Sequence, residues 1–482
     1  MINKKIIIKV MGLLLLIEGF FLGISALVSL YYGQDDLYAL VLTSGICIAT
    51  GISLNFLTSN APKNIGKREG YIIVSLVWVI FSLFGALPFV ISGAIPSYTD
   101  AFFETISGFT TTGASILNNI EEIPMGLLFW RSLTQWLGGM GIIVLSIAIL
   151  PMFGIGGMQL FVAEVPGPTP DKLHPRVKET AKRLWGIYVI YTVAEIILLK
   201  IGGMNWFDAI NHSFTTMATG GYSTKQASIA HFNSPFIHYV IIVFMFLAGT
   251  NFTLSYFALH LNFKKVFKDE EFRFYIGFVV LFTAIIAFTL WHHGGYSPEQ
   301  SFRDSLFQVV SIITTTGFAT ADYLQWMPFV VVMIFALMFF GGSAGSTGGS
   351  VKIIRITLLL KNSYQELKRI IHPNAIIPVR INNKSVPPQI ISNILAFVVF
   401  YMFMTIGGTI VISALGYDLE TSMGAVAATL GNIGPGIGLV GPIENYAHFP
   451  AFGKWFLSFL MLIGRLELFT VIVLLSPSFW KK

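Results

Sequence analysis

The chain is 482 residues long, and 54% of its residues are hydrophobic while only 11% are charged. An average soluble domain carries about 25% charged side chains, so this composition excludes a set of soluble globular domains. The formal net charge of +6 does not indicate nucleic-acid binding, because the basic residues stand at the ends of apolar stretches and form no cluster on a soluble module. The apolar stretches are about 20 residues long, enough to cross a lipid bilayer as helix. The sequence therefore predicts an all-α polytopic membrane protein.

The N-terminal segment could be mistaken for a cleaved signal peptide. A basic stretch over 1–9 precedes an apolar stretch over 10–31, but this apolar stretch is long and a second one follows closely. We interpret it as an uncleaved first helix with its N-terminus inside. The single cysteine, Cys47, lies within the second apolar stretch, so neither an intrachain disulfide nor a thiolate metal cluster is expected.

Apolar stretches recur along the whole chain. The predicted helices cover 8–31, 37–58, 70–92, 125–150, 183–202, 236–261, 273–292, 326–360, 389–415 and 452–475. With the N-terminus inside, lysine and arginine gather in the internal loops, whereas acids such as Asp35, Glu121 and Glu444 lie in external segments. This distribution follows the positive-inside rule and predicts that both termini are cytoplasmic.

The external connections over 97–124, 204–235, 295–325 and 417–451 share one pattern. Each begins with an apolar helical stretch too short to span and then reaches a turn rich in threonine and glycine. Such stretches are typical of re-entrant helices, and irregular backbone at membrane depth must be buried in protein or line a watery cavity.

These connections form an internal repeat. The spacing from acid to glycine is 13 residues in the first three (113 − 100, 221 − 208 and 317 − 304) and 14 in the fourth (434 − 420), where the acids are Asp100, Asp208, Asp304 and Glu420. Repetition at fixed spacing indicates repeated structural units. The predicted organisation is an N-terminal two-helix extension (1–69) and four helix, re-entrant loop, helix repeats (70–182, 183–272, 273–385 and 386–482).

Four such units can close around one axis with their turns at the centre. The acid is expected to cap the re-entrant helix, while the negative end of that helix favours a cation near mid-membrane. Beyond it, the glycine permits torsions that turn carbonyl groups inward, and carbonyl rings suit K⁺ because they replace its hydration shell. A packed turn between helices would explain one such sequence, but four registered copies favour an ion-binding ring.

The residues of these turns, and several other motifs, resemble the Trk/Ktr superfamily of potassium uptake proteins over essentially the whole chain, most closely its TrkH-type subunit. The supporting stretches are 100–114, 135–141, 154–160, 341–349, 432–436 and 464–469. The resemblance implies a pseudo-tetrameric pore within one chain of a bacterial-type inner membrane protein, commonly assembled as a homodimer. It implies no covalent cofactor, with K⁺ as the transported ion.

Carried over residue by residue, the resemblance assigns the K⁺-coordinating backbone of the selectivity filter to pairs of residues in the four turns. These residues are Thr111, Thr112, Thr219, Gly220, Thr315, Thr316, Asn432 and Ile433, and the turn glycines are Gly113, Gly221, Gly317 and Gly434. The fourth turn departs from the threonine-glycine pattern. Each turn has a shorter filter sequence than the Gly-Tyr-Gly type, which predicts modest selectivity over Na⁺.

The stretch from Trp326 to Lys361 is too long for one span, and a run of small residues interrupts it. The run should break the helix into halves joined by a flexible loop. It contains Gly341, Gly342, Gly345, Gly348 and Gly349. A phosphate-binding loop is the competitor, but the sequence lacks its lysine and a preceding strand. Close helix packing is the other alternative; the resemblance implies an intramembrane gate.

Arg465 lies near the middle of the last predicted helix, where a charge costs about 2.5–3.5 kcal/mol on insertion scales. Glu467 is two positions away and thus on another face of the helix, which makes it a poor partner. We expect Arg465 to reach the pore below the filter and meet the loop 341–350, blocking ions or anchoring a closed state. The alternative is a structural ion pair between helices.

The sequence thus predicts a gated, channel-like K⁺ uptake subunit that also passes Rb⁺ and is not an enzyme. A symporter coupling K⁺ to H⁺ or Na⁺ is the alternative, although no acidic relay is evident in the spans. An integral membrane enzyme would need clustered acids or histidines, and no such motif appears. The resemblance also implies a cytosolic TrkA-type nucleotide-binding ring, which would contact the basic loops around 170–183 and 361–384.

Overall fold

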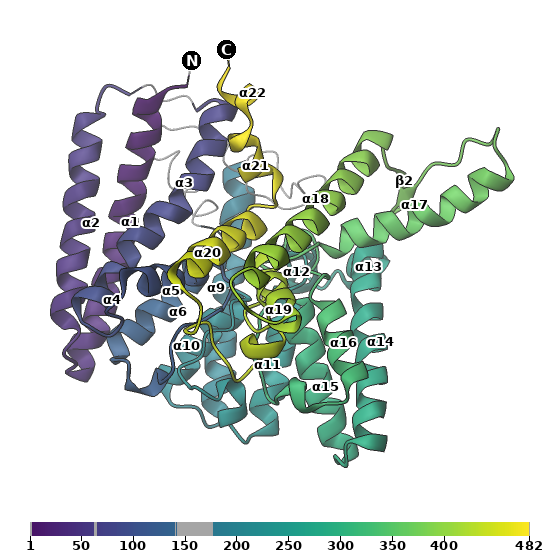
Figure 1. The fold of residues 1–482 in the computed structure, drawn as a ribbon, viewed down its shortest axis with the longest axis horizontal. Helices are drawn as coiled ribbons and strands as arrows, with labels where there is room; N and C mark the ends of the chain where they lie inside the picture. The colour runs from purple at the N-terminus through teal and green to yellow at the C-terminus, as the bar shows by residue number, and fades with distance from the viewer. Residues whose placement is uncertain (1, 62–64, 140, 142–176, 482) are drawn as a thin grey trace.

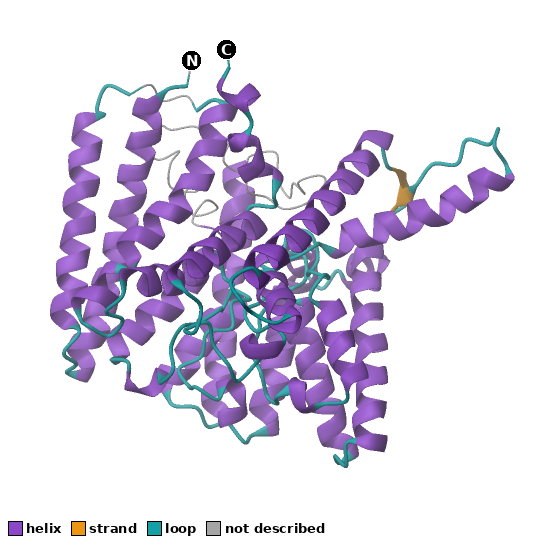
Figure 2. Ribbon diagram, in the orientation of Figure 1, coloured by secondary structure: helices purple, strands orange, loops and turns teal. Residues whose placement is uncertain are grey.

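The computed structural model describes residues 2–61, 65–139, 141 and 177–481. Within these ranges the chain is overwhelmingly helical, and Figure 2 shows strands only in one short hairpin. The predicted all-α membrane fold is confirmed. Figure 1 shows the N-terminal helices packed side by side at one flank and both termini at the same end of the molecule.

The elements follow one another in chain order. The first group is α1 (Lys4–Tyr32), α2 (Leu37–Leu57), α3 (Lys67–Gly85), α4 (Leu87–Ile91), α5 (Tyr98–Phe109), η1 (Ile120–Glu122) and α6 (Met125–Gly139). The second is α9 (Val177–Ile201), α10 (Trp206–Met217), η3 (Ser228–His231), α11 (Pro235–Ala248), α12 (Phe252–Leu259) and α13 (Phe263–Lys268).

The third group is α14 (Glu270–His293), α15 (Pro298–Ile313), η4 (Tyr323–Gln325), α16 (Pro328–Leu337), α17 (Ile353–Ile371), β1 (Arg380–Ile381) and β2 (Lys384–Ser385). The last is α18 (Pro388–Ser413), α19 (Leu419–Leu430), η5 (Gly438–Val440), α20 (Ala451–Arg465), α21 (Phe469–Leu475) and α22 (Pro477–Trp480). The short helices α5, α10, α15 and α19 occupy the stretches predicted to re-enter.

Six helices of the described residues are long and apolar enough to cross a membrane, or eight if each of two bent helix pairs counts as one span. The predicted helix over 125–150 is seen as α6 up to Gly139; of its remainder, 140 and 142–150 lie outside the described residues. The predicted interruption of 326–360 is confirmed, because α16 ends at Leu337 and α17 begins at Ile353.

The prediction of single straight helices over 236–261 and 452–475 was wrong. The first is bent by 112° between α11 and α12, and the second by 119° between α20 and α21. At the second bend Glu467 and Leu468 have φ angles of 54° and 49°, a left-handed conformation that ends an α-helix. At the first bend the Asn251 side chain accepts a hydrogen bond from Thr253 N–H at 2.8 Å and so caps a new helix.

The proposed capping acids also need correction. The side chains that cap the four short helices are those of Ser97, Asn205, Ser297 and Asp418. Asp208 and Asp304 instead accept hydrogen bonds from the hydroxyls of Thr224 (2.6 Å) and Thr320 (3.3 Å). These two acids therefore tie α10 and α15 to the chain that follows their turns.

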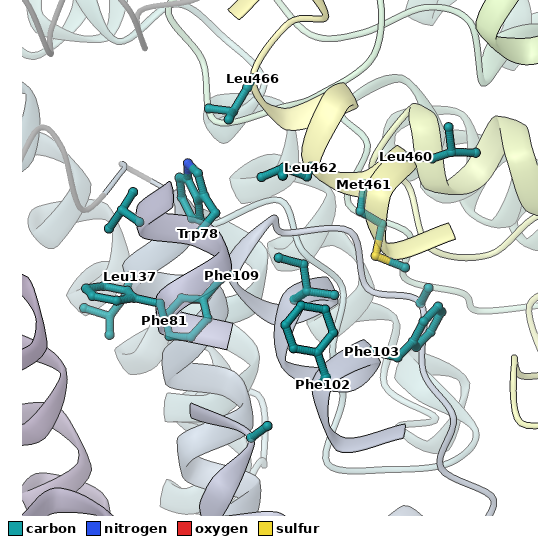
Figure 3. Close-up of a cluster of buried hydrophobic side chains, with 14 of the residues drawn as sticks. Trp78, Phe81, Phe102, Phe103, Phe109, Leu137, Leu460, Met461, Leu462 and Leu466 are labelled. Carbon is teal, nitrogen blue, oxygen red and sulfur yellow. The ribbon is translucent and has the colours of Figure 1, made fainter. Parts of the chain in front are cut away.

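The short helix α5 is held between α3, α6 and α20 by large apolar side chains. Figure 3 shows Trp78 and Phe81 of α3 near Phe109 of α5, with Met461 of α20 on the other side. All four are 1% exposed or less. Lipid is as apolar as these side chains, so close packing and hydrogen bonds, more than water exclusion, hold α5 in place.

Candidate functional site

The four turns after α5, α10, α15 and α19 share one backbone conformation. Left-handed φ angles of 53°, 53°, 58° and 53° occur at Thr111, Thr219, Thr315 and Asn432. Two residues later, φ is 82°, 74°, 80° and 95° at Gly113, Gly221, Gly317 and Gly434. A β-branched threonine seldom adopts a left-handed conformation, so its recurrence at three equivalent positions indicates one repeated structure, which the sequence spacing had predicted.

The turns contact one another in cyclic order. A Cβ atom built on Gly113 would overlap the carbonyl oxygen of Gly220, and one on Gly221 would overlap that of Thr316. In the same way Gly317 abuts the carbonyl oxygen of Ile433. The ring closes where Gly434 faces the carbonyl oxygen of Thr112, 2.7 Å from the built Cβ. The turn residues must therefore be glycines for steric as well as conformational reasons.

Side-chain hydrogen bonds hold the first and third turns in shape. The hydroxyls of Thr110 and Thr112 lie 2.8 Å apart, and the corresponding hydroxyls of Thr314 and Thr316 lie 2.7 Å apart. The Asn432 amide donates to the Thr112 hydroxyl at 2.9 Å, which links the fourth turn to the first. These side chains are fully buried, so the turns are part of the protein interior and not a surface loop.

A cavity of about 80 Å³ lies on one side of the ring. All four turn glycines line it, together with residues of the return segments that include Ser223, Lys225, Glu444 and Asn445. The ring thus separates this polar cavity from the loop on its opposite side.

A buried ion pair supports the first turn, and sequence reasoning missed it. Arg131 of α6 pairs with Glu104 of α5 at 2.7 Å, with side chains 2% and 0% exposed. Arg131 also donates to the Ser223 carbonyl at 2.9 Å and lies 3.5 Å from the centre of the Tyr222 ring. Leaving either charge unpaired here would cost about 3–5 kcal/mol. The signal available in the sequence was an arginine within the predicted helix over 125–150.

The segment 341–350 packs directly against the ring. Gly349 N–H donates to the Thr315 hydroxyl at 2.7 Å, and the Thr347 hydroxyl lies 3.2 Å from that of Thr219. The glycines of this segment, which were predicted to form a gate, permit close approach to backbone carbonyls. Gly341 approaches Gly349 O, Gly342 approaches Gly249 O, Gly348 approaches Thr314 O and Gly349 approaches Gly431 O, while Gly345 faces the Asn251 side chain. The ammonium group of Lys352 donates to Gly348 O.

Arg465 joins this loop to the ring. Its guanidinium donates to the Thr111 hydroxyl at 3.1 Å and to the Thr347 carbonyl at 2.7 Å. It also donates to the carbonyls of Gly138 and Gly139, at 2.6 and 2.9 Å. Glu467 pairs with Arg355 instead. The structure therefore brings Arg465, the loop 341–350 and the four turns together. The left-handed Thr111 contacts Arg465, and the left-handed Thr219 and Thr315 contact the loop.

Long apolar helices and a ring of four turns in mutual contact define the class: this is a multi-span helical membrane protein. The family model described as "TrkH: Cation transport protein" matches residues 38–482. The chain therefore belongs to the TrkH family of cation transport proteins.

Individual relatives agree with this assignment. The chain is 42% identical to the Trk system potassium uptake protein TrkH of Escherichia coli K12 over 99% of both chains. It is 41% identical to the TrkH protein of Halomonas elongata over 100% of both. The crystal structure of the potassium transporter TrkH from Vibrio parahaemolyticus superposes with a TM-score of 0.89, at 38% identity and with full coverage of both chains. The predicted resemblance is confirmed.

Proposed function

We propose that this protein takes up K⁺ across the cell membrane through a gated, channel-like pore lined by backbone carbonyls. The observation that carries the proposal is the closed ring of four turns, in which each turn glycine abuts the carbonyl of the next turn. The names of the relatives, which refer to potassium uptake, support K⁺ as the ion.

The ring has the chemistry that a K⁺ filter needs. The left-handed residue and its neighbour in each turn supply carbonyl oxygens that substitute for water around a dehydrated cation without adding fixed charge. The coordinating residues are Thr111, Thr112, Thr219, Gly220, Thr315, Thr316, Asn432 and Ile433. Four repeats around one axis form the pore, in the units 70–182, 183–272, 273–385 and 386–482 that follow the N-terminal extension 1–69. The cavity above the ring is the external vestibule.

Arg465 and the loop 341–350 together close the pore below the filter. The guanidinium contacts both a filter threonine and the loop, so a cation leaving the ring meets a fixed positive charge. At a separation of about 4 Å and an effective dielectric constant of about 20, two unit charges repel by about 4 kcal/mol. Opening therefore requires the loop and Arg465 to move aside.

The proposal extends to the assembly and its orientation. The protein lies in the bacterial inner membrane with both termini in the cytoplasm and forms a homodimer. A cytosolic TrkA-type nucleotide-binding ring regulates it from the internal face, where the basic loops around 170–183 and 361–384 offer contacts; residues 170–176 of the first loop lie outside the described residues.

The decisive experiment measures ion flux into liposomes that hold the purified protein. We expect K⁺ and Rb⁺ to move down their gradients without a proton or sodium gradient, because the ring needs no second ion to bind K⁺. Empty liposomes and protein-containing liposomes with Na⁺ in place of K⁺ are the controls. Strict dependence of K⁺ flux on H⁺ or Na⁺ would support the symporter instead, and absence of K⁺ flux would overturn both.

A further inference from the structure

The second turn lacks the side chains that support the first and third. Thr110 pairs with Thr112 in the first turn, and Thr314 pairs with Thr316 in the third. The equivalent positions of the second turn are Ala218 and Gly220, which have no hydroxyl groups. The second turn also ends in two consecutive glycines, the combination with the greatest backbone freedom. Something else must therefore hold it in the shape that it shares with the other turns.

Gln135 of α6 occupies the space beside this turn. Its Nε2 donates to the carbonyl oxygen of Gly220 at 2.7 Å, and its Oε1 accepts from Tyr222 N–H at 3.0 Å. The side chain is fully buried. Because one partner is an acceptor and the other a donor, the two hydrogen bonds fix which end of the amide points to which partner. Gln135 thus forms a hydrogen bond with the residue on each side of Gly221.

Gly220 and Gln135 depend on each other for space. Gly220 does not have a positive φ angle, unlike Gly221 (74°), so its backbone conformation would admit a side chain. A Cβ atom at Gly220 would nevertheless lie 2.5 Å from Oε1 and 2.7 Å from Nε2 of Gln135, too close for either atom. The glycine is therefore needed at this position because the glutamine amide fills the volume that a threonine side chain takes in the first and third turns.

Arg131, one helical turn before Gln135, contacts the same stretch of chain. It donates to Ser223 O at 2.9 Å and stacks on Tyr222. Positions i and i+4 lie on one face of a helix, so α6 of the first repeat presents two buried polar side chains to the segment 220–223 of the second. Arg131 has a buried carboxylate partner in Glu104, whereas the hydrogen bonds of Gln135 are both to the second turn and its return segment.

From these contacts we infer that Gln135 is a positioning residue that determines ion specificity by holding the Gly220 carbonyl in the ring. This inference rests on the proposed function of the ring as a K⁺ filter. Without the amide, the Gly220–Gly221 segment gains rotational freedom and its carbonyl leaves the neighbourhood of Gly113. A ring short of one fixed oxygen replaces the hydration shell of K⁺ less completely, so discrimination against Na⁺ falls while the helices remain in place.

The test compares K⁺ and Na⁺ flux in liposomes for the wild type, Gln135→Ala and Gln135→Met. Methionine keeps the length and approximate volume of glutamine but cannot donate to Gly220 O, so it isolates the hydrogen bond from packing. We expect the K⁺ over Na⁺ preference to fall about fivefold in both variants, the effect of one hydrogen bond, with a monodisperse protein and measurable K⁺ flux. Gln308→Met is the matched control, because Gln308 is also fully buried but donates to Ala321 O in the third return segment. It should keep the wild-type preference.

A second comparison tests the steric pairing. Gly220→Thr should reduce K⁺ flux at least tenfold when Gln135 is present, and Gln135→Ala combined with Gly220→Thr should recover most of that loss, because the threonine then has room. Equal losses in both backgrounds, or unchanged selectivity in Gln135→Met, overturn the inference while leaving the filter intact. A wild-type protein that passes no K⁺ overturns the proposed function itself, so the two failures are distinguishable.

Discussion

The left-handed residues of the four turns adopt a backbone conformation of high free energy. A left-handed φ costs a residue other than glycine roughly 1–2 kcal/mol, and Thr111, Thr219, Thr315 and Asn432 all adopt one. Hydrogen bonds from neighbouring elements offset this cost, since Thr111 accepts from Arg465 and Thr315 from Gly349. Strained residues held by their surroundings in this way are typical of functional sites.

Gly113 offers a residue-scale test with a matched control. Gly113→Ala introduces a left-handed alanine (φ 82°) and also drives its Cβ into Gly220 O, whereas Gly93→Ala meets the same backbone cost (φ 79°) with no atom within 4 Å. We expect Gly93→Ala to lose roughly 1–2 kcal/mol of stability and Gly113→Ala to lose more, because only Gly113→Ala adds a steric overlap. Only Gly113→Ala should also lose K⁺ over Na⁺ preference, by about tenfold, in the liposome assay. Equal selectivity in the two variants would show that the turn is merely structural.

At the scale of elements, three helices that follow the turns are interrupted. The interruptions lie between α11 and α12, between α16 and α17, and between α20 and α21. Each places glycine next to the ring or the loop: Gly249 meets Thr314, Gly342 meets Gly249 and Gly464 meets Leu430. Broken helices free backbone groups at membrane depth, which is tolerated only where protein or a water-filled cavity surrounds them. These breaks therefore make room for the loop 341–350 and for Arg465.

The proposed blocking role of Arg465 can be tested by removing its charge. Arg465→Ala removes the cation beneath the ring, and we expect a rise of at least tenfold in initial K⁺ flux because the repulsion of about 4 kcal/mol disappears. Arg303→Ala is the control: Arg303 pairs with Glu299 on the same helix and does not contact the loop. Unchanged flux in a folded Arg465→Ala protein would contradict the blocking role.

Shortening the loop tests the same barrier without removing a charge. Deletion of residues 344–346 should raise basal K⁺ flux several-fold, because Thr347 and Gly349 would no longer reach the hydroxyls of Thr219 and Thr315. The rate of Rb⁺ entry into liposomes is the measurement, with size-exclusion elution as the check on folding. Loss of all flux in a folded protein would mean that the loop supports the filter and does not obstruct it.

At the scale of the whole molecule, the two ends of the chain meet on one side. Arg68 donates to the Lys481 carbonyl at 2.9 Å, and Asn3 N–H donates to Glu69 at 2.9 Å. The positive-inside rule predicts that this side faces the cytoplasm. In the proposed orientation, the segment of Glu444, which lines the cavity beside the ring, faces the outside.

Single-cysteine labelling checks this orientation. The only cysteine in the sequence is Cys47, which is fully buried, so Cys47→Ser gives a silent background. In that background an impermeant maleimide added to intact cells should label Glu444→Cys, and should label Lys481→Cys only after permeabilisation. The opposite pattern would reverse the assigned topology, and equal labelling of both sites in sealed cells would contradict a fixed orientation.

The sequence by itself determined the membrane fold and the location of the candidate site. The length of the apolar stretches determines the spans. The spacing from acid to glycine recurs because four copies of one local structure need the same residues at the same offsets. Local chemistry was sufficient even for the helix break after Leu337, since a run of small residues cannot sustain a helix.

Only the tertiary structure decided which long-range partners complete the site. The bends after Ala248 and Arg465 were not predicted, and the glycines beside them, Gly249 and Gly464, contact residues distant in the sequence, Thr314 and Leu430. The partners of Arg465, at Thr111 and Thr347, lie more than a hundred residues away in the sequence. By contrast, the hydroxyl partners of Thr110 and Thr314 are only two residues distant. Gln135 and Gly220 are 85 residues apart. The fit of the Gln135 amide beside Gly220 depends on how α6 packs against the second turn, which residue spacing does not predict.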